Sequence, residues 1–224
     1  MWIEIYNYLH SIYLTILMLN ILGYSALLFL KKNAFKPILI YLLGAIIAEI
    51  GTYLINNNII TVFGEITNAP FIFLFLTIQF LCFSYFYKLN IKNRWFQKYF
   101  YMLFCVVSVI AYSIYIIDFN SIMTHNPWLS FITIPFILFL TTIYFYELLK
   151  NEKGYRYINI GVFMVSSCTL IFLSSATFYE NISYELLSIK QSLHITPLIF
   201  LQLLFLYEAF LFFKSRKKKV PKIN

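Results

Sequence analysis

Apolar segments alternate with short polar segments along the whole chain. Each apolar segment is 17 to 25 residues long, and a helix needs about 20 apolar residues to cross the hydrocarbon core of a bilayer. Such runs are typical of transmembrane helices rather than of helices in soluble domains. The pattern therefore predicts an all-α membrane protein with seven transmembrane helices. We place them at residues 6–30, 37–55, 69–87, 99–117, 129–149, 157–179 and 197–213.

The composition agrees with this prediction. The chain has 224 residues, of which 61% are hydrophobic and 12% are charged, and a soluble domain of this size needs more charge to cover its surface. Seven helices and short connections use almost the whole length. We therefore expect one transmembrane domain over residues 1–213 and a basic tail over residues 214–224.

The positive charges predict the orientation of the bundle. The connections after the first, third, fifth and seventh predicted helices hold three, four, three and six Lys or Arg residues, and the other side holds only Lys190. Cytoplasmic loops carry the excess of Lys and Arg, so we expect the N-terminus outside and the C-terminus in the cytoplasm, in a cytoplasmic (inner) membrane.

The same charges predict the partners of the inner face. Basic residues at the inner leaflet attract anionic lipid head groups, which accounts for the net charge of +8 without nucleic acid. Docking of an acidic cytoplasmic protein is the alternative for the tail. The candidate residues for these contacts are Lys214, Arg216, Lys217, Lys218 and Lys219.

Four polar residues within the predicted helices form the candidate intramembrane site. They are Glu49, Gln79, Gln202 and Glu208. Ionisable groups inside a membrane are costly and are functional candidates by default. Counted along each helix, Glu49 and Gln202 are expected in one layer, and Gln79 and Glu208 in a deeper one.

Two interpretations of these residues are open. They form hydrogen bonds between helices, each contributing about 0.6–2 kcal/mol, or they line a ligand pocket or a proton or ion path. Asn20 is a weaker candidate of the same kind. Glu147 lies one turn from the inner end of its helix, where we expect it to pair with Lys150 or Lys153.

No set of residues indicates catalysis or a bound metal. No two histidines share a helix face at four-residue spacing, so a histidine-rich metal site is not predicted. The sequence contains neither a glycine-rich phosphate loop nor a serine in a nucleophile elbow. We therefore expect no cofactor, no metal and no catalytic residue.

Two aromatic-rich segments carry a resemblance. Residues 78–87 (IQFLCFSYFY) and 144–151 (YFYELLKN) resemble parts of small, uncharacterised bacterial membrane proteins with seven helices. That family is itself similar to the membrane portions of sensor kinases. The resemblance implies the seven-helix layout but no reaction and no ligand. Members of the family often have an acid where this chain has Gln79.

These observations lead to three functional hypotheses. The first is a receptor-like or sensor component that binds a small or apolar ligand and acts through a separate partner. The second is a small-solute or proton-coupled transporter, suggested by Glu49 and Glu208 and by a weak similarity between residues 70–86 and 197–213. The third, an intramembrane lipid-modifying enzyme, has the least support because it lacks a nucleophile or metal set.

Overall fold

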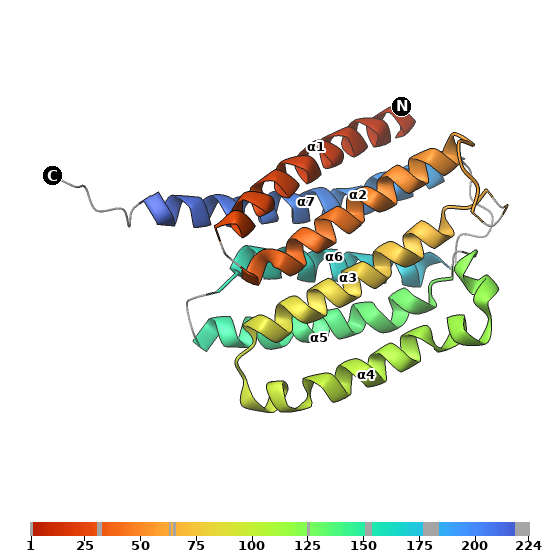
Figure 1. Cartoon of the computed structure of the whole chain (residues 1–224). Coiled ribbons are helices and arrows are strands. Elements are labelled where there is room, and N and C mark those ends of the chain that lie inside the picture. The colour runs from red at the N-terminus through yellow and green to blue at the C-terminus, as the bar shows by residue number, and fades with distance from the viewer. Residues whose placement is uncertain are drawn as a thin grey trace.

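The computed structural model describes residues 2–30, 33–62, 64, 66–124, 126–150, 154–176 and 184–217, and of residues 174–176, 184–188, 190, 216 and 217 only the backbone. The described residues contain no β-strand, and seven of their helices are long and apolar enough to cross a membrane. This confirms the predicted all-α class with seven long apolar helices (Figure 1). The seven are α1 (Trp2–Phe29), α2 (Lys36–Asn56), α3 (Ala69–Asn90), α4 (Arg94–Ile117), α5 (Trp128–Lys150), α6 (Arg156–Ala176) and α7 (Tyr184–Lys217). Two short 3₁₀ helices, η1 (Asn33–Phe35) and η2 (Phe119–Ile122), precede α2 and follow α4.

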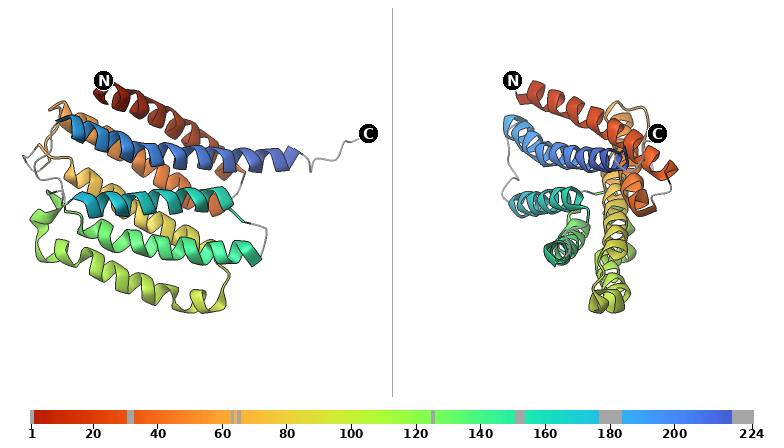
Figure 2. Two further views of the ribbon diagram at one scale, coloured as in Figure 1. Left: turned by 180° about the vertical axis from the view of Figure 1, so that it is seen from behind. Right: turned by 90° about the vertical axis from the view of Figure 1, so that its left-hand side faces the viewer.

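The helices form two layers, seen most clearly along the bundle in Figure 2. Around the bundle, α1 packs on α2, α2 on α3, α3 on α5, α5 on α6, α6 on α7 and α7 again on α1. These six helices close a ring. Helix α4 lies outside it, mainly against α5, and has few contacts with α3.

Aromatic side chains fill the centre of the ring. The fully buried ring of Tyr41 on α2 lies 4.7 Å from that of Phe83 and 6.2 Å from that of Phe205, measured between centroids. Tyr24 on α1 packs against the other side of Phe205 at 6.1 Å. Such edge and tilted contacts stabilise aromatic pairs beyond their buried area.

Small residues bring α2 close to α3. A side chain at Gly44 would meet Ile78 within 3.0 Å, and one at Gly51 would collide with the ring of Phe71. Glycine at these positions allows close approach of neighbouring helices.

Three of the predicted helix starts are wrong by four residues or more, and the first of them is α1, which begins at Trp2 and not at residue 6. Helix α4 begins at Arg94, because the Asn93 side chain accepts hydrogen bonds from the N–H groups of Trp95 and Phe96 and caps the helix. Helix α7 begins at Tyr184, so Pro197 lies inside it and does not start it. Pro197 lacks an N–H group, so the helix loses one backbone hydrogen bond there. The helical turns before and after Pro197 are otherwise continuous.

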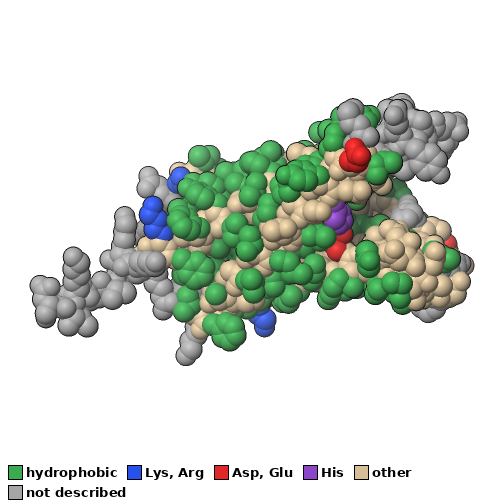
Figure 3. Space-filling view, turned by 90° about the horizontal axis from the view of Figure 1, so that it is seen from above, with side chains coloured by type: hydrophobic (Ala, Val, Ile, Leu, Met, Phe, Trp, Pro, Cys, Tyr) green, Lys and Arg blue, Asp and Glu red, His purple; other side chains and the backbone are tan. Residues whose placement is uncertain are grey.

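The two ends of the bundle differ in charge. We name them the N-terminal end, where α1 begins, and the C-terminal end, where α7 finishes. The helix bounds place every described Lys and Arg at the C-terminal end except Lys190, which lies in the first turns of α7. Figure 3 shows blue side chains at this end and mainly apolar side chains between the two ends.

Apolar side chains are exposed along the middle of the bundle. Leu22 on α1, Val109 on α4 and Ile171 on α6 are 68%, 69% and 66% exposed. Apolar surface of this extent is rare on soluble monomers. It fits contact with lipid chains, so the structure describes a multi-pass membrane protein.

Candidate functional site

Glu208 lies at the C-terminal end of the bundle, where its carboxylate binds the start of α6. Its Oε2 atom accepts a hydrogen bond of 3.0 Å from the backbone N–H of Tyr157. The first N–H groups of a helix have no partner within the helix, and negative charge is stabilising there. Glu208 shares a cavity wall with Leu89 and Asn90, which lie about ten residues or 15 Å beyond Gln79 along α3. Glu208 and Gln79 therefore do not share the predicted layer. Gln79 lies buried on α3, which does not pack against α7.

Glu147 on α5 also binds backbone N–H groups at the start of another helix. Its two carboxylate oxygens accept hydrogen bonds of 2.8 and 2.6 Å from the N–H groups of Lys92 and Asn93, just before α4. The expected pair with Lys150 is replaced by these backbone contacts, and Lys153 lies outside the described residues. The C-terminal turns of α5 and α7 thus hold the starts of α4 and α6.

An open cavity of about 760 Å³ lies beside Glu208. The ends of α3 and α7, the loop before α4, the last turns of α5 and the loop before α6 surround it. Its wall contains Leu89, Asn90, Lys92, Tyr144, Gly154, Tyr155, Glu208, Leu211, Phe212 and Ser215. We name it the C-end cavity.

Two tyrosines shape this cavity. The Tyr144 hydroxyl accepts a hydrogen bond of 2.9 Å from the N–H of Tyr155. Tyr155 itself lies just before the membrane-spanning part of α6, and burial together with the nearby charge of Glu208 raises the pKa of its phenol. The phenol therefore stays protonated and remains a hydrogen-bond donor in the cavity wall.

Gln202 lies in the middle of the bundle and pairs with Asn20. The Asn20 Nδ2 group donates to the backbone oxygen of Gln202 at 2.7 Å and to its Oε1 atom at 2.8 Å. Both side chains are fully buried. Gln202 lies level with Asn20, whereas Glu49 lies level with His10, which is about ten residues or 15 Å earlier on α1. The two residues therefore do not share the predicted layer. Asn20 Oδ1 and Gln202 Nε2 have no hydrogen-bond partner.

A second buried amide was missed by the sequence analysis. Asn159 on α6 is fully buried and accepts a hydrogen bond of 2.8 Å from the hydroxyl of Tyr87 on α3. Its Nδ2 group donates to the backbone oxygen of Thr141 on α5 at 3.3 Å. Its place near the start of a predicted helix gave no signal that it joins three helices.

Glu49 lies toward the N-terminal end and faces α1. Its Oε2 atom is 3.5 Å from Nε2 of His10, and the two side chains are about 30% exposed. The hydroxyl of Tyr6 lies 3.5 Å from Nδ1 of the same histidine. Tyr6 and His10 are four residues apart and share one face of the helix, a spacing that could have revealed this contact.

A smaller cavity of about 170 Å³ lies at the N-terminal end. Apolar side chains of α3, α4 and α6 line most of it, and polar groups come from η2, from the loop after it and from Ser130 of α5. The lining comprises Ala69, Ile72, Phe73, Leu76, Tyr115, Ser121, Thr124, Asn126, Pro127, Ser130 and Leu173. We name it the N-end cavity. The sequence analysis missed it because its walls are ordinary apolar residues.

Hydrogen bonds fix the loop that closes the N-end cavity. Asp118 accepts from the N–H of Asn120 and from the hydroxyl of Ser121, both at 3.0 Å. The Tyr115 hydroxyl donates to the backbone oxygen of Asn126 at 3.3 Å. The cavity is therefore part of the folded framework and is formed before any ligand arrives.

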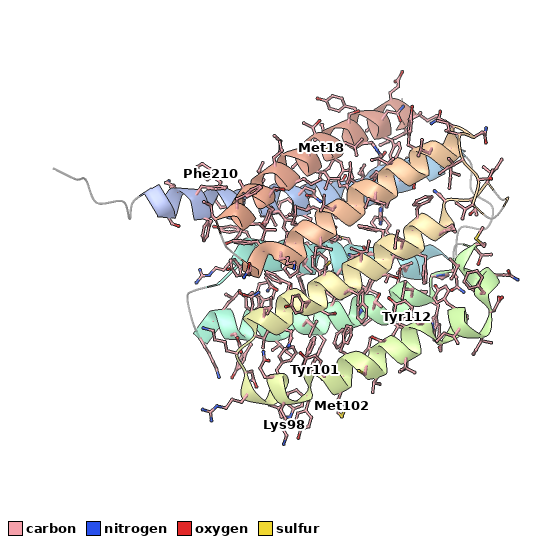
Figure 4. The ribbon with its side chains drawn as sticks, in the orientation of Figure 1. Met18, Lys98, Tyr101, Met102, Tyr112 and Phe210 are labelled. Carbon is pink, nitrogen blue, oxygen red and sulfur yellow. The ribbon has the colours of Figure 1, made fainter. Side chains whose placement is uncertain are left out.

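The basic surface at the C-terminal end combines lysines with aromatic rings. The ammonium of Lys88 lies 4.3 Å from the ring centre of Tyr101 and donates to its hydroxyl, and that of Lys150 lies 4.3 Å from the ring of Tyr146. Figure 4 shows Tyr101 with Lys98 in the first turns of α4. Tyr and Lys anchors of this kind are typical of a membrane interface.

The predicted tail contacts are only partly within the described residues. Lys214 is exposed in the last turns of α7, and the backbone of Arg216 and Lys217 continues this helix. Lys218 and Lys219 lie outside the described residues.

Comparison with known proteins does not connect this chain to a family. No protein-family model, no curated protein and no solved structure matches this chain. The resemblance to the membrane portions of sensor kinases therefore stays a prediction. What the structure supports is a multi-pass membrane protein with seven apolar helices, a cavity at each end and carboxylates bound between helices.

Proposed function

We propose that this protein is a sensor or receptor component of a bacterial cytoplasmic membrane. It takes up a small, mostly apolar ligand in the N-end cavity and acts through a separate protein at the basic C-terminal end. The N-end cavity carries this proposal. It lies at the end opposite the positive charges, and in the orientation that those charges favour it faces outward.

The size and lining of the N-end cavity support a small ligand. An apolar protein cavity of about 150 Å³ binds benzene, and the N-end cavity has about 170 Å³. Ligand pockets are mostly apolar with a few polar groups that fix orientation. Here Ser121, Asn126 and Ser130 supply those groups, so an aromatic alcohol is a suitable probe.

Binding is tested with benzyl alcohol and protein in lipid nanodiscs, by saturation-transfer NMR. Ser130→Leu fills the cavity, whereas Thr142→Leu makes a similar change on an exposed face of the same helix. We expect transfer to the probe with the unmodified protein and with Thr142→Leu, and its loss with Ser130→Leu. Equal transfer in all three, or transfer no greater than in empty nanodiscs, overturns the proposal.

The orientation is tested with single cysteines introduced at Glu4 and Lys214 in a chain whose three native cysteines are replaced. We expect a membrane-impermeant maleimide to label the cysteine at position 4 in intact cells and the one at position 214 only after permeabilisation. The reverse order of labelling contradicts the proposed topology.

The partner is tested by truncation after Lys214. The basic end supports binding of an acidic surface, so removal of residues 215–224 is expected to reduce cross-linking to the cytoplasmic partner and the signal that it carries. An unchanged signal after truncation counts against action through this end.

Transport is a second candidate because two carboxylates, Glu49 and Glu208, lie in apolar helices. They are at opposite ends of the bundle, and the fully buried Leu17, Tyr41 and Phe205 lie between them, which favours the sensor. Solute or proton flux in vesicles that is abolished by Glu208→Gln would favour the transporter instead.

A further inference from the structure

The C-end cavity combines one negative group with one positive group. Of the residues that line it, Glu208 and Lys92 carry charge. They come from different segments, the last turns of α7 and the loop before α4. A ligand that carries both a cation and an anion can pair with both groups.

The surroundings of Glu208 fit an ammonium group. The rings of Tyr144, Tyr155 and Phe212 line the cavity together with this carboxylate, and aromatic faces attract ammonium groups. These rings are held in place by others: Tyr155 packs 5.0 Å from Phe35, and Phe212 packs 5.6 Å from the same ring. The aromatic wall is therefore preorganised.

Glu208 holds α6 and retains acceptor capacity. A carboxylate offers about four acceptor positions, and the backbone N–H groups of Tyr157 and Ile158 use two of them. The group can therefore cap the helix and receive a ligand cation at the same time. The apolar Leu89 and Leu211 in the wall provide contact for the hydrocarbon part of an amphipathic ligand.

The position of the cavity narrows the class of ligand. It lies at the end of the bundle where lysines and tyrosines mark a membrane interface, which is the depth of lipid head groups. Positively charged surroundings oppose a ligand that is only cationic, and they favour one that carries phosphate. An aminophospholipid meets all of these conditions.

We propose that the C-end cavity binds the head group of an aminophospholipid such as phosphatidylethanolamine. The primary ammonium lies against Glu208 and the aromatic wall, and the phosphate lies toward Lys92. This site is separate from the N-end cavity and does not depend on the proposed sensor function.

The test uses the full chain in nanodiscs of phosphatidylethanolamine and phosphatidylcholine in equal amounts, followed by native mass spectrometry of the lipids retained. Glu208→Gln removes the charge but keeps an acceptor for Tyr157 N–H. We expect this variant and Lys92→Gln each to lower the ratio of retained phosphatidylethanolamine to phosphatidylcholine by about fivefold or more.

Matched controls separate the site from general charge effects. Glu49→Gln removes a carboxylate at the other end, and Lys98→Gln removes an exposed lysine of the same end outside the cavity. Both are expected to leave the ratio unchanged. Because Lys92→Gln alters only an exposed side chain, it keeps the test valid if Glu208→Gln does not fold.

A competition experiment identifies the source of the head group. If free phosphoethanolamine displaces the lipid, the head group alone suffices, and if it does not, the acyl chains contribute to binding; either result supports the site. Equal retention of both lipids by the unmodified protein, or unchanged retention in Glu208→Gln and Lys92→Gln, overturns the proposal.

Discussion

The carboxylates at the two ends of the bundle have different partners. At the C-terminal end, Glu208 and Glu147 accept hydrogen bonds from backbone N–H groups at the starts of α6 and α4. Toward the N-terminal end, Glu49 on α2 faces the side chain of His10 on α1. The first kind of contact fixes where a neighbouring helix begins, whereas the second joins two partly exposed side chains. An acid in an apolar helix therefore holds the backbone of a neighbouring helix in one place and pairs with a side chain in another.

The largest loss of unfolding free energy is expected for Glu208→Leu. This change leaves the N–H of Tyr157 without its acceptor in a largely apolar region, which costs about 2 kcal/mol of unfolding free energy. Glu208→Gln keeps an acceptor and is expected to lose less than half as much. Reversible unfolding in mixed micelles measures both, and equal losses for the two variants would contradict the role of this oxygen.

The next largest loss of unfolding free energy is expected in the middle of the bundle. Asn20→Leu and Gln202→Leu each break a fully buried contact between α1 and α7, with an expected loss of about 1–2 kcal/mol. A double-mutant cycle isolates the pair, for which we expect a coupling of about 0.6–1.7 kcal/mol. Additive losses would show that the two amides act independently.

Glu147→Ala tests the second carboxylate that binds backbone at the C-terminal end. Its bonds to Lys92 and Asn93 lie near water, so we expect a loss of about 1 kcal/mol, smaller than for Glu208→Leu. Faster amide exchange at residues 92 and 93 is the specific readout. If these amides exchange as slowly in the variant as in the unmodified chain, the carboxylate does not hold the loop.

The smallest effect is expected at the N-terminal end. The side chains of His10 and Glu49 are about 30% exposed, and exposed ion pairs contribute about 0.2–1 kcal/mol. His10→Gln, Glu49→Gln and the double variant form a cycle whose coupling should lie within that range. A coupling above 2 kcal/mol would make this contact as structural as those of the opposite end.

The length and spacing of the apolar runs were enough to predict seven helices. Helix ends were less predictable, because polar side chains such as Asn93 extend α4 into a charged region and because α7 continues through Pro197. Neither effect changes the hydrophobic pattern. Both arise from local hydrogen bonding at the ends of the apolar segments.

The partners of the polar residues could not be predicted from depth alone. Depth along each helix placed Gln202 with Glu49 and Glu208 with Gln79, but a contact also requires neighbouring helices. The order of helices in the ring, in which α7 lies between α1 and α6 and α4 lies outside, decides which polar residues can meet. Gln202 therefore meets Asn20, and Glu208 meets the start of α6.

The two ends also differ in what they offer a ligand, and this difference underlies the proposed function. The N-end cavity is small and mostly apolar, whereas the C-end cavity is larger and contains charge. A sensor requires that occupancy of the N-end cavity changes the C-terminal end of the bundle. Helices α3, α5 and α6 contribute to both cavities or lie directly beside both, so they connect the two ends.

The most direct test is hydrogen–deuterium exchange of the protein in nanodiscs, with and without benzyl alcohol. The account predicts slower exchange at residues 69–76 and 121–130 together with altered exchange at residues 208–215. It predicts the same response in Thr142→Leu and none in Ser130→Leu. Exchange that changes only at the N-terminal end, or equally in the cavity-filled variant, would contradict a signal that passes from one end to the other.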